Sequence, residues 1–141
     1  MENATDKVAL RYALEISPDD YAIQKSLYDE GIAARDYLAT ASAQDLVVAA
    51  RSTSSKYIDQ KLWYDSQLES RNYLAMVDDP ELFQLARSKH PDDLRRQKRF
   101  YDEQLPAKIY MNSLPPSPET ARLGSRYPDD YVMQKLLYKN Q

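Results

Sequence analysis

Hydrophobic residues recur along this chain at the spacing of an α-helix. Around Gln60, for example, Tyr57 and Tyr64 stand seven positions apart, and Trp63 and Leu68 widen the same apolar stripe. Positions seven apart lie on one face of a helix, whereas a half-buried strand would alternate apolar and polar residues, a pattern that is absent here. The chain has only 2 glycines, too few for a turn-rich β fold. The pattern therefore predicts an all-α fold.

The apolar pattern belongs to a unit that repeats along the chain. The dipeptide Gln-Lys occurs four times at successive spacings of 36, 37 and 37 residues, as Gln24-Lys25, Gln60-Lys61, Gln97-Lys98 and Gln134-Lys135. Similar residues surround each copy, so the Gln serves below as the reference position of its repeat. Self-similarity at a fixed period is typical of helical-repeat proteins. The sequence predicts an α-solenoid-like array that forms a single domain over 1–141, with about three and a half repeats at 6–41, 42–78, 79–115 and 116–141.

Tyrosines occupy fixed places in this repeat. Ten of the 12 tyrosines stand three residues before, four residues after or thirteen residues after the reference Gln. They are Tyr21, Tyr57 and Tyr131 before it, Tyr28, Tyr64, Tyr101 and Tyr138 at plus four, and Tyr37, Tyr73 and Tyr110 at plus thirteen. Tyrosines at helical spacing usually bury the ring and keep the hydroxyl at the rim, although exposed rings can also stack nucleic-acid bases. We expect the tyrosines to contribute to the core.

Capping residues mark the expected helix starts. A Pro-Asp-Asp sequence precedes the reference Gln at 18–20, 91–93 and 128–130, and Ser54-Ser55-Lys56 replaces it in the second copy. We expect the proline at the first helical position and both carboxylates in the first turn, where the helix dipole favours them. A second set of starts at Ser42, Asp79-Pro80 and Ser117-Pro118 predicts short helices over about 6–16, 43–52, 80–88 and 118–125.

A further helix boundary is expected inside the repeat. Gly31 and Pro106 stand seven and nine residues after their reference Gln. Proline inside a helix costs about 3 kcal/mol, so a break near this point is favoured over one long helix. Each repeat would then contain three helices: a short one, a longer one with Gln-Lys, and another short one.

Composition narrows the possible location and chemistry. The net charge is −3, apolar residues make up 43% of the chain and cysteine is absent, so disulfides and thiol chemistry are excluded. The chain has no run of about 18 apolar residues, so the sequence predicts no membrane span, and residues 1–6 do not resemble the start of a secretory signal. We expect a cytoplasmic location without membrane contact, while export by a route without such a signal stays open.

The Gln-Lys pairs are the sharpest candidate site. The Gln falls within the apolar stripe, so we expect it to be buried and to hydrogen-bond an adjacent repeat, although a row of identical amides could also bind a repetitive ligand. The Lys can pair with the Asp four residues later in three copies. The basic residues at plus eleven are expected to bridge repeats to that Asp, with a phosphate-binding ladder as the alternative. The candidate partner-binding or inter-repeat residues are Gln24, Lys25, Gln60, Lys61, Gln97, Lys98, Gln134, Lys135, Arg35, Arg71 and Lys108.

Signals for catalysis are weak. The paired aspartates are explained by their place beside a helix start, and the single histidine, His90, cannot form a metal cluster or a proton relay by itself. Phosphate-binding loops, dinucleotide-binding fingerprints and nucleophile elbows are all absent. We therefore expect no enzyme activity, cofactor or metal.

The favoured function is a non-enzymatic module that binds or scaffolds another protein, because helical arrays build long surfaces. One alternative is nucleic-acid binding through the Lys, Arg and Tyr positions, with a basic patch at Arg95, Arg96 and Arg99; the net charge of −3 argues against it. A second alternative is a structural spacer in a larger protein. An exposed apolar patch would favour the first function, and a continuous basic groove would favour nucleic acid.

Overall fold

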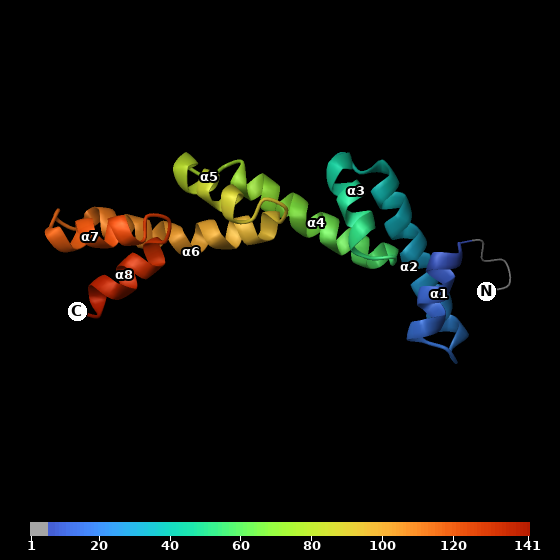
Figure 1. Cartoon of the computed structure of the whole chain (residues 1–141). Helices are drawn as coiled ribbons and strands as arrows, with labels where there is room; N and C mark the ends of the chain where they lie inside the picture. Colours follow the sequence, from blue (N-terminus) through green and yellow to red (C-terminus); the bar gives the residue numbers. More distant parts are fainter. Residues whose placement is uncertain (1–5) are drawn as a thin grey trace. The chain divides into compact units, whose positions relative to one another are not determined.

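The computed structural model describes residues 6–141, and the regular secondary structure in that part of the chain is all helical (Figure 1). The helices are α1 (Lys7–Ile16), α2 (Tyr21–Thr40), α3 (Gln44–Thr53), α4 (Tyr57–Leu74), α5 (Pro80–Lys89), α6 (Leu94–Ser113), α7 (Pro118–Arg126) and α8 (Tyr131–Lys139). The predicted all-α fold is confirmed, and the four short helices lie within one or two residues of their expected places.

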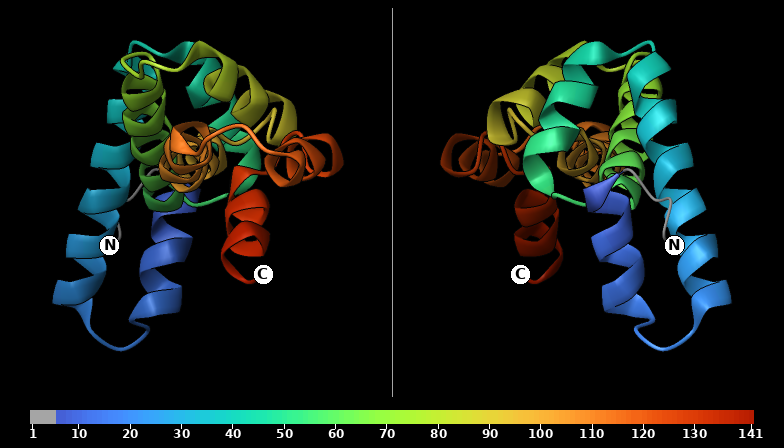
Figure 2. Two further views of the ribbon diagram at one scale, coloured as in Figure 1. Left: turned by 90° about the vertical axis from the view of Figure 1, so that its left-hand side faces the viewer. Right: turned by 90° about the vertical axis from the view of Figure 1, so that its right-hand side faces the viewer.

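The chain divides into two compact units, Met1–Glu69 and Ser70–Gln141, with the boundary inside α4. In the N-terminal unit α1 and α2 pack side by side (Figure 2). In the C-terminal unit α6 packs against α5 and α8, and α7 packs against α8. The single-domain organisation and the solenoid arrangement stay predictions.

The expected break inside the repeat is wrong, because α2 runs through Gly31 and α6 runs through Pro106. Gly31 is buried against α1, where a Cβ would come within 3.2 Å of the Ala9 Cβ, so the glycine permits a close helix contact. Pro106 is exposed on α6, and the carbonyl that loses its helical partner there belongs to the exposed Asp102. The first three repeats therefore each contain one short and one long helix, and the fourth contains two short ones, α7 and α8.

The Pro-Asp-Asp sequences form turns instead of first helical turns. The second aspartate of each is the N-cap, as in α2, where the Asp20 carboxylate accepts the Ile23 N–H at 3.1 Å. Asp93 and Asp130 cap α6 and α8 in the same way. The proline lies in the turn before the cap, because its fixed φ and missing N–H suit a position where a helix has just ended. In α3 the cap position falls on Ala43 rather than the expected Ser42.

A repeated tyrosine contact joins the two helices of a repeat. The hydroxyl of the plus-four tyrosine accepts the backbone N–H of the short helix's N-cap residue at 3.2 Å in three copies: Asp6 to Tyr28, Ala43 to Tyr64 and Asp79 to Tyr101. In the fourth copy the N-cap N–H of Ser117 is satisfied by Thr120 Oγ1 at 3.0 Å. Tyr64 and Tyr101 are almost fully buried, as predicted for core tyrosines, whereas the core prediction is wrong for Tyr21, Tyr37 and Tyr73, which are exposed.

Candidate interaction surfaces

The four reference glutamines are buried, as predicted, but they do not bridge repeats. Each side-chain amide donates to the carbonyl of the residue that ends the short helix of its own repeat. The pairs are Gln24 to Ser17 at 2.9 Å, Gln60 to Ser54 at 2.8 Å, Gln97 to His90 at 2.8 Å and Gln134 to Tyr127 at 2.6 Å. The carbonyls at a helix end lack helical partners, so these bonds satisfy them and fix the turn. The glutamines are therefore part of the helical hairpin and are not presented to a ligand.

The lysines that follow Gln60, Gln97 and Gln134 take part in contacts between repeats, whereas Lys25 pairs with Asp29 of its own repeat. In the N-terminal unit Lys61 lies 4.7 Å from the centre of the Tyr37 ring and pairs with Asp65 at 2.9 Å. The Tyr37 hydroxyl donates to the same Asp65 carboxylate at 2.6 Å. We call this arrangement the Lys–Asp–Tyr cluster. The expected surface pair between Lys and Asp is confirmed, and the plus-thirteen tyrosine of the preceding repeat completes it.

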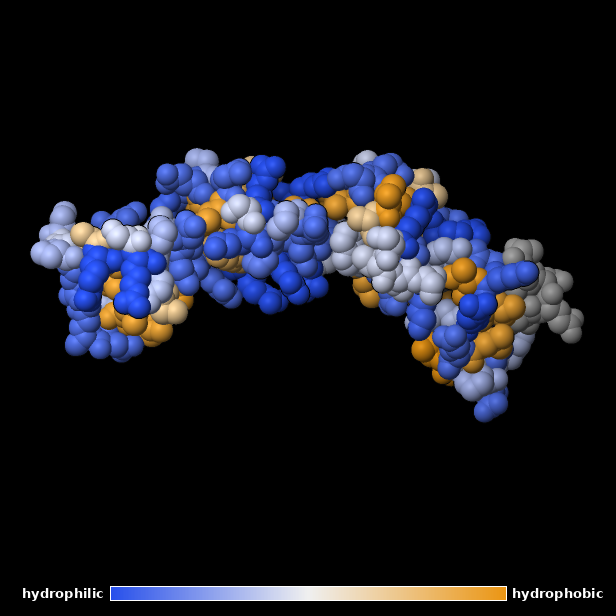
Figure 3. All heavy atoms as spheres, in the orientation of Figure 1, coloured by the Kyte–Doolittle hydropathy of each residue, from blue (hydrophilic) through white to orange (hydrophobic). Residues whose placement is uncertain are grey.

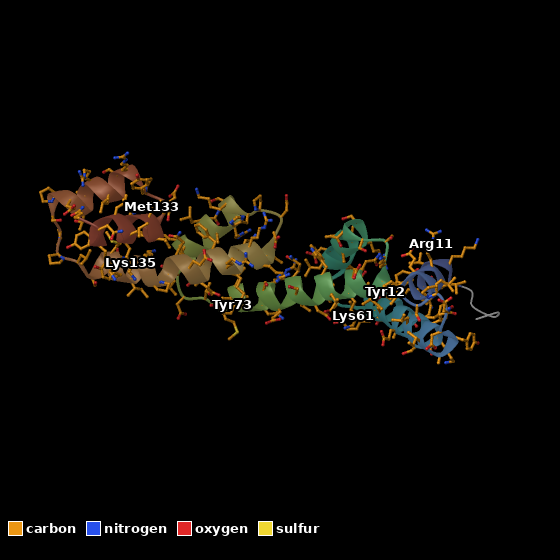
Figure 4. The ribbon with its side chains drawn as sticks, turned by 90° about the horizontal axis from the view of Figure 1, so that it is seen from below. Arg11, Tyr12, Lys61, Tyr73, Met133 and Lys135 are labelled. Atoms are coloured by element: carbon orange, nitrogen blue, oxygen red, sulfur yellow. The ribbon has the colours of Figure 1, made fainter. Side chains whose placement is uncertain are left out.

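The C-terminal unit contains the same cluster between α4 and α6. Lys98 lies 4.6 Å from the Tyr73 ring centre and 3.6 Å from Asp102, which accepts a short hydrogen bond from the Tyr73 hydroxyl. At the last junction, where Lys139 replaces the Asp, Lys135 and Lys139 lie 4.9 and 5.1 Å from the Tyr110 ring. Figure 4 labels Lys61, Tyr73 and Lys135, which belong to these contacts. A cation over an aromatic face is attracted to it, so lysine alone can hold the Tyr110 ring.

The hydrogen bond to Asp65 raises the pKa of Tyr37 to about 12, and partial burial contributes in the same direction. Burial by itself would raise the pKa of Asp65, but the hydrogen bonds from Tyr37 and Lys61 lower it overall. The cluster is therefore most stable with a neutral tyrosine and an ionised aspartate.

Alkaline pH should weaken this cluster. An unfolded tyrosine titrates near pH 10, whereas Tyr37 in the folded chain titrates at about 12. The stability that its hydroxyl adds is therefore fully present below pH 10 and is lost as the pH rises towards 12. We expect the urea midpoint of the N-terminal unit, followed by Trp63 fluorescence, to fall less between pH 9 and ~11.5 in Tyr37→Phe than in the wild type. Parallel pH profiles for the two proteins would contradict the role of this hydroxyl.

Two of the three basic residues at plus eleven pair with the N-cap aspartate of their own repeat, not with the Asp at plus five as expected. Arg35 binds Asp6 at 3.0 Å, and Lys108 binds Asp79 at 2.7 Å. The tyrosine at the start of the helix that carries the next reference Gln contacts each of these ion pairs. Tyr57 donates to Asp6 at 3.0 Å, and Lys108 lies 5.7 Å from the Tyr131 ring. These basic side chains are therefore engaged within the protein; Arg71, the third of the series, is half-buried and also has an interaction partner.

A second glutamine, missed in the sequence, makes the contact between repeats that was expected of the first. Gln104 is buried on α6, and its Oε1 accepts the N–H groups of Tyr131 at 2.7 Å and Val132 at 3.3 Å. Its Nε2 donates to the N-cap residue Asp130 at 3.2 Å. Gln67, in the equivalent place on α4, is 2% exposed. The sequence signal was available, since both stand seven residues after a reference Gln.

An apolar groove lies in the C-terminal unit. It has a volume of about 680 Å³ and is lined by Tyr73, Met76, Val77, Asp78, Asp79, Tyr101, Leu105 and Ile109. Met76 is 84% exposed and Ile109 is 61% exposed, so two large apolar side chains meet solvent there. The floor is formed by residues of the local core around Tyr101, and Asp78 and Asp79 add a polar edge.

The predicted basic patch is exposed and confined to the start of α6. Arg95, Arg96 and Arg99 are all exposed, and Arg96 lies 3.6 Å from Asp93. His90 ends α5, where its backbone N–H donates to the Ala86 carbonyl at 3.0 Å. Over residues 6–141 no group of three or more His, Cys, Asp or Glu side chains is arranged to hold a metal ion. None of the helices in that range is both long and apolar enough to cross a membrane.

Comparison of the chain with protein-family models, with curated protein sequences and with solved structures finds no match in any of the three.

Proposed function

We propose that the chain is a non-enzymatic protein-binding or scaffolding module built from tandem helical repeats. The observation that carries the proposal is the apolar groove between Tyr73 and Ile109. Contiguous exposed apolar surface with a polar edge is typical of protein interaction sites, and methionine adapts well to varied partners.

Repetition of the same contacts supports the tandem-repeat part of the proposal. In all four copies the reference Gln donates a hydrogen bond to the carbonyl at the end of the short helix. The Lys–Asp–Tyr cluster forms once in each compact unit. Solenoid proteins are stabilised by such contacts within each unit and between nearest neighbours. They commonly use the resulting extended surfaces for binding.

The groove is the part of this proposal that can be tested most directly. A photo-crosslinking amino acid at Met76 should form covalent adducts with a protein partner in a native lysate. The same group at Val48, which is 67% exposed on α3, serves as the control and should form few adducts. Both positions are exposed, so surface substitutions there should change stability by no more than about 0.5 kcal/mol.

Charged substitutions in the groove should reduce the capture of the same partner. We expect Met76→Glu combined with Ile109→Glu to reduce its capture at least ~10-fold, because each carboxylate would be desolvated in an apolar contact. Val48→Glu should retain capture. Equal adduct yields at positions 76 and 48, or full capture by the doubly substituted chain, would contradict a role for the groove and favour the spacer alternative.

Nucleic-acid binding has less support. Arg95, Arg96 and Arg99 are exposed, but they occupy a single turn of α6. The rings of Tyr37 and Tyr73, which could stack bases, each lie under a lysine and donate their hydroxyl to an aspartate. Submicromolar, salt-sensitive binding that disappears in an Arg95/Arg96/Arg99→Ala chain would promote this alternative. The cytoplasmic location also stays a prediction.

A further inference from the structure

One face of α2 carries the two charged groups of a Lys–Asp–Tyr cluster without a tyrosine. Lys25 and Asp29 stand at the same repeat positions as Lys61 and Asp65, and their side chains are already paired at 2.8 Å. Among residues 6–141 no tyrosine hydroxyl donates to Asp29, whereas Asp65 and Asp102 each accept one. The receiving half of the contact is therefore formed before any tyrosine is bound.

Exposure distinguishes this face from its equivalents. The Lys25 and Asp29 side chains are 64% and 58% exposed, against 38% for both Lys61 and Asp65. Tyr21, which occupies the position of the half-buried Tyr57 and Tyr131, is 62% exposed. A large aromatic side chain is thus left in solvent where its equivalents are partly covered.

The surface beside Lys25 and Asp29 is also hollowed. A depression of about 470 Å³ is lined by Ala22, Lys25, Ser26, Asp29, Glu30 and Ala33. The small side chains leave room for a ring, and Glu30 adds a second carboxylate beside Asp29. The hairpin of α1 and α2 exposes further apolar residues, including Leu14, Ile16 and Ile23, and Figure 3 shows hydrophobic surface over this hairpin.

We propose that this face of α2 binds the end of an α-helix from another polypeptide, one that carries Arg or Lys, any residue, Tyr, and then Leu or Met. The inference rests on the proposed tandem-repeat organisation, because the three helix ends of that kind within the chain begin at Arg35, Arg71 and Lys108. Two of the tyrosines in these helix ends, Tyr37 and Tyr73, donate to the aspartate of a Lys–Asp pair.

The chemistry of the bound state follows from the occupied clusters. The partner's tyrosine ring would lie under the Lys25 ammonium and its hydroxyl would donate to Asp29, as Tyr37 does with Lys61 and Asp65. The partner's basic residue would face the exposed Tyr21 ring, as Lys108 faces Tyr131. Charge complementarity favours such a partner, since the depression is bordered by two carboxylates, Asp29 and Glu30, and only one ammonium group, Lys25, so its net negative charge attracts a helix end that carries Arg or Lys.

The test uses the full ¹⁵N-labelled chain and a side-chain-stapled helical peptide with the sequence of residues 64–77, which contains Arg71 and Tyr73. Amide shifts should concentrate in residues 21–33. The same peptide with Tyr73→Phe should bind about 5- to 10-fold more weakly, because it loses a hydrogen bond to a charged acceptor. Asp29→Asn in the chain should weaken the parent peptide similarly, and combining both changes should add no further loss. Lys25→Gln should weaken it about 3-fold.

Arg122→Gln is the matched control, because Arg122 belongs to an exposed ion pair with Glu119 and should leave the affinity unchanged. The proposal would be overturned by amide shifts centred outside residues 21–33, by equal binding of the Tyr73→Phe peptide, or by no shifts at peptide concentrations up to ~1 mM. Self-association of the chain that Lys25→Gln abolishes would assign the face to a second copy and would also overturn it. The groove experiment probes Met76 and Ile109 in the other compact unit, so either result can fail without the other.

Discussion

Replacing Tyr64 with alanine should destabilise the N-terminal unit by about 3–5 kcal/mol, the usual cost of truncating a large buried aromatic side chain. Tyr64 is 1% exposed, its hydroxyl accepts the Ala43 N–H at 3.2 Å, and the Tyr37 ring meets it edge-on at 5.9 Å. Domains of this size are stable by only about 5–15 kcal/mol, so the loss should be visible as a large shift in a urea melt. Trp63, the single tryptophan, is the adjacent residue and reports on this unit.

Tyr138 provides the comparison, because it holds the same repeat position but is only half-buried. The centre of its ring lies 6.4 Å from that of Tyr110. We expect Tyr138→Ala to shift the urea midpoint, followed by circular dichroism, far less than Tyr64→Ala. Tyr64→Phe, which keeps the ring, should cost only about 1 kcal/mol. Equal midpoints for Tyr64→Ala and Tyr138→Ala would show that the plus-four position is not core.

The second large effect is expected at Gln104, where leucine should loosen α8. Leucine is similar in size but removes the acceptor of the Tyr131 and Val132 N–H groups and one of the donors to Asp130, which keeps its bond from the Met133 N–H. Tyr131 is half-buried, so water can replace part of the loss, and we expect a cost of about 2 kcal/mol. Hydrogen exchange of residues 131–139 should then accelerate roughly 30-fold.

Gln84→Leu is the control for this experiment, since Gln84 is exposed on α5 and undergoes the same chemical change. Exchange in α8 should be unaffected by it. If Gln104→Leu also leaves the exchange of α8 unchanged, Gln104 does not anchor the start of that helix.

Local sequence signals and tertiary contacts explain different parts of this protein. Capping residues identified the short helices because a cap acts over three or four residues, as in Ser117 with the Thr120 N–H at 3.1 Å. The interior break at Gly31 was wrong because a local propensity of about 1 kcal/mol against glycine is smaller than the packing that the glycine permits against Ala9. Pro106 shows the same outcome, since packing around Ala107 and Met111 holds α6 together across it.

For the candidate site residues, too, part of the outcome was predictable from the sequence and part depended on tertiary contacts. Burial of the reference glutamines was predictable from their place in the apolar stripe, but their partner was not, because a turn carbonyl and a neighbouring repeat satisfy an amide equally well. Arg35 and Lys108 could likewise have paired with either of two aspartates, and only the tertiary structure places Asp6 and Asp79 within reach.

The sequence by itself determined the helical class, the repeat and its period, and the positions of tyrosine and lysine in it, because these depend on residue order and spacing. Only the tertiary structure decided that each repeat has two helices and that Gln104, not the reference Gln, joins neighbouring repeats. It also showed that Lys25 and Asp29 are paired with each other without a tyrosine. Such contacts join residues about 20–30 positions apart, and their choice among competing partners depends on the three-dimensional distances between them.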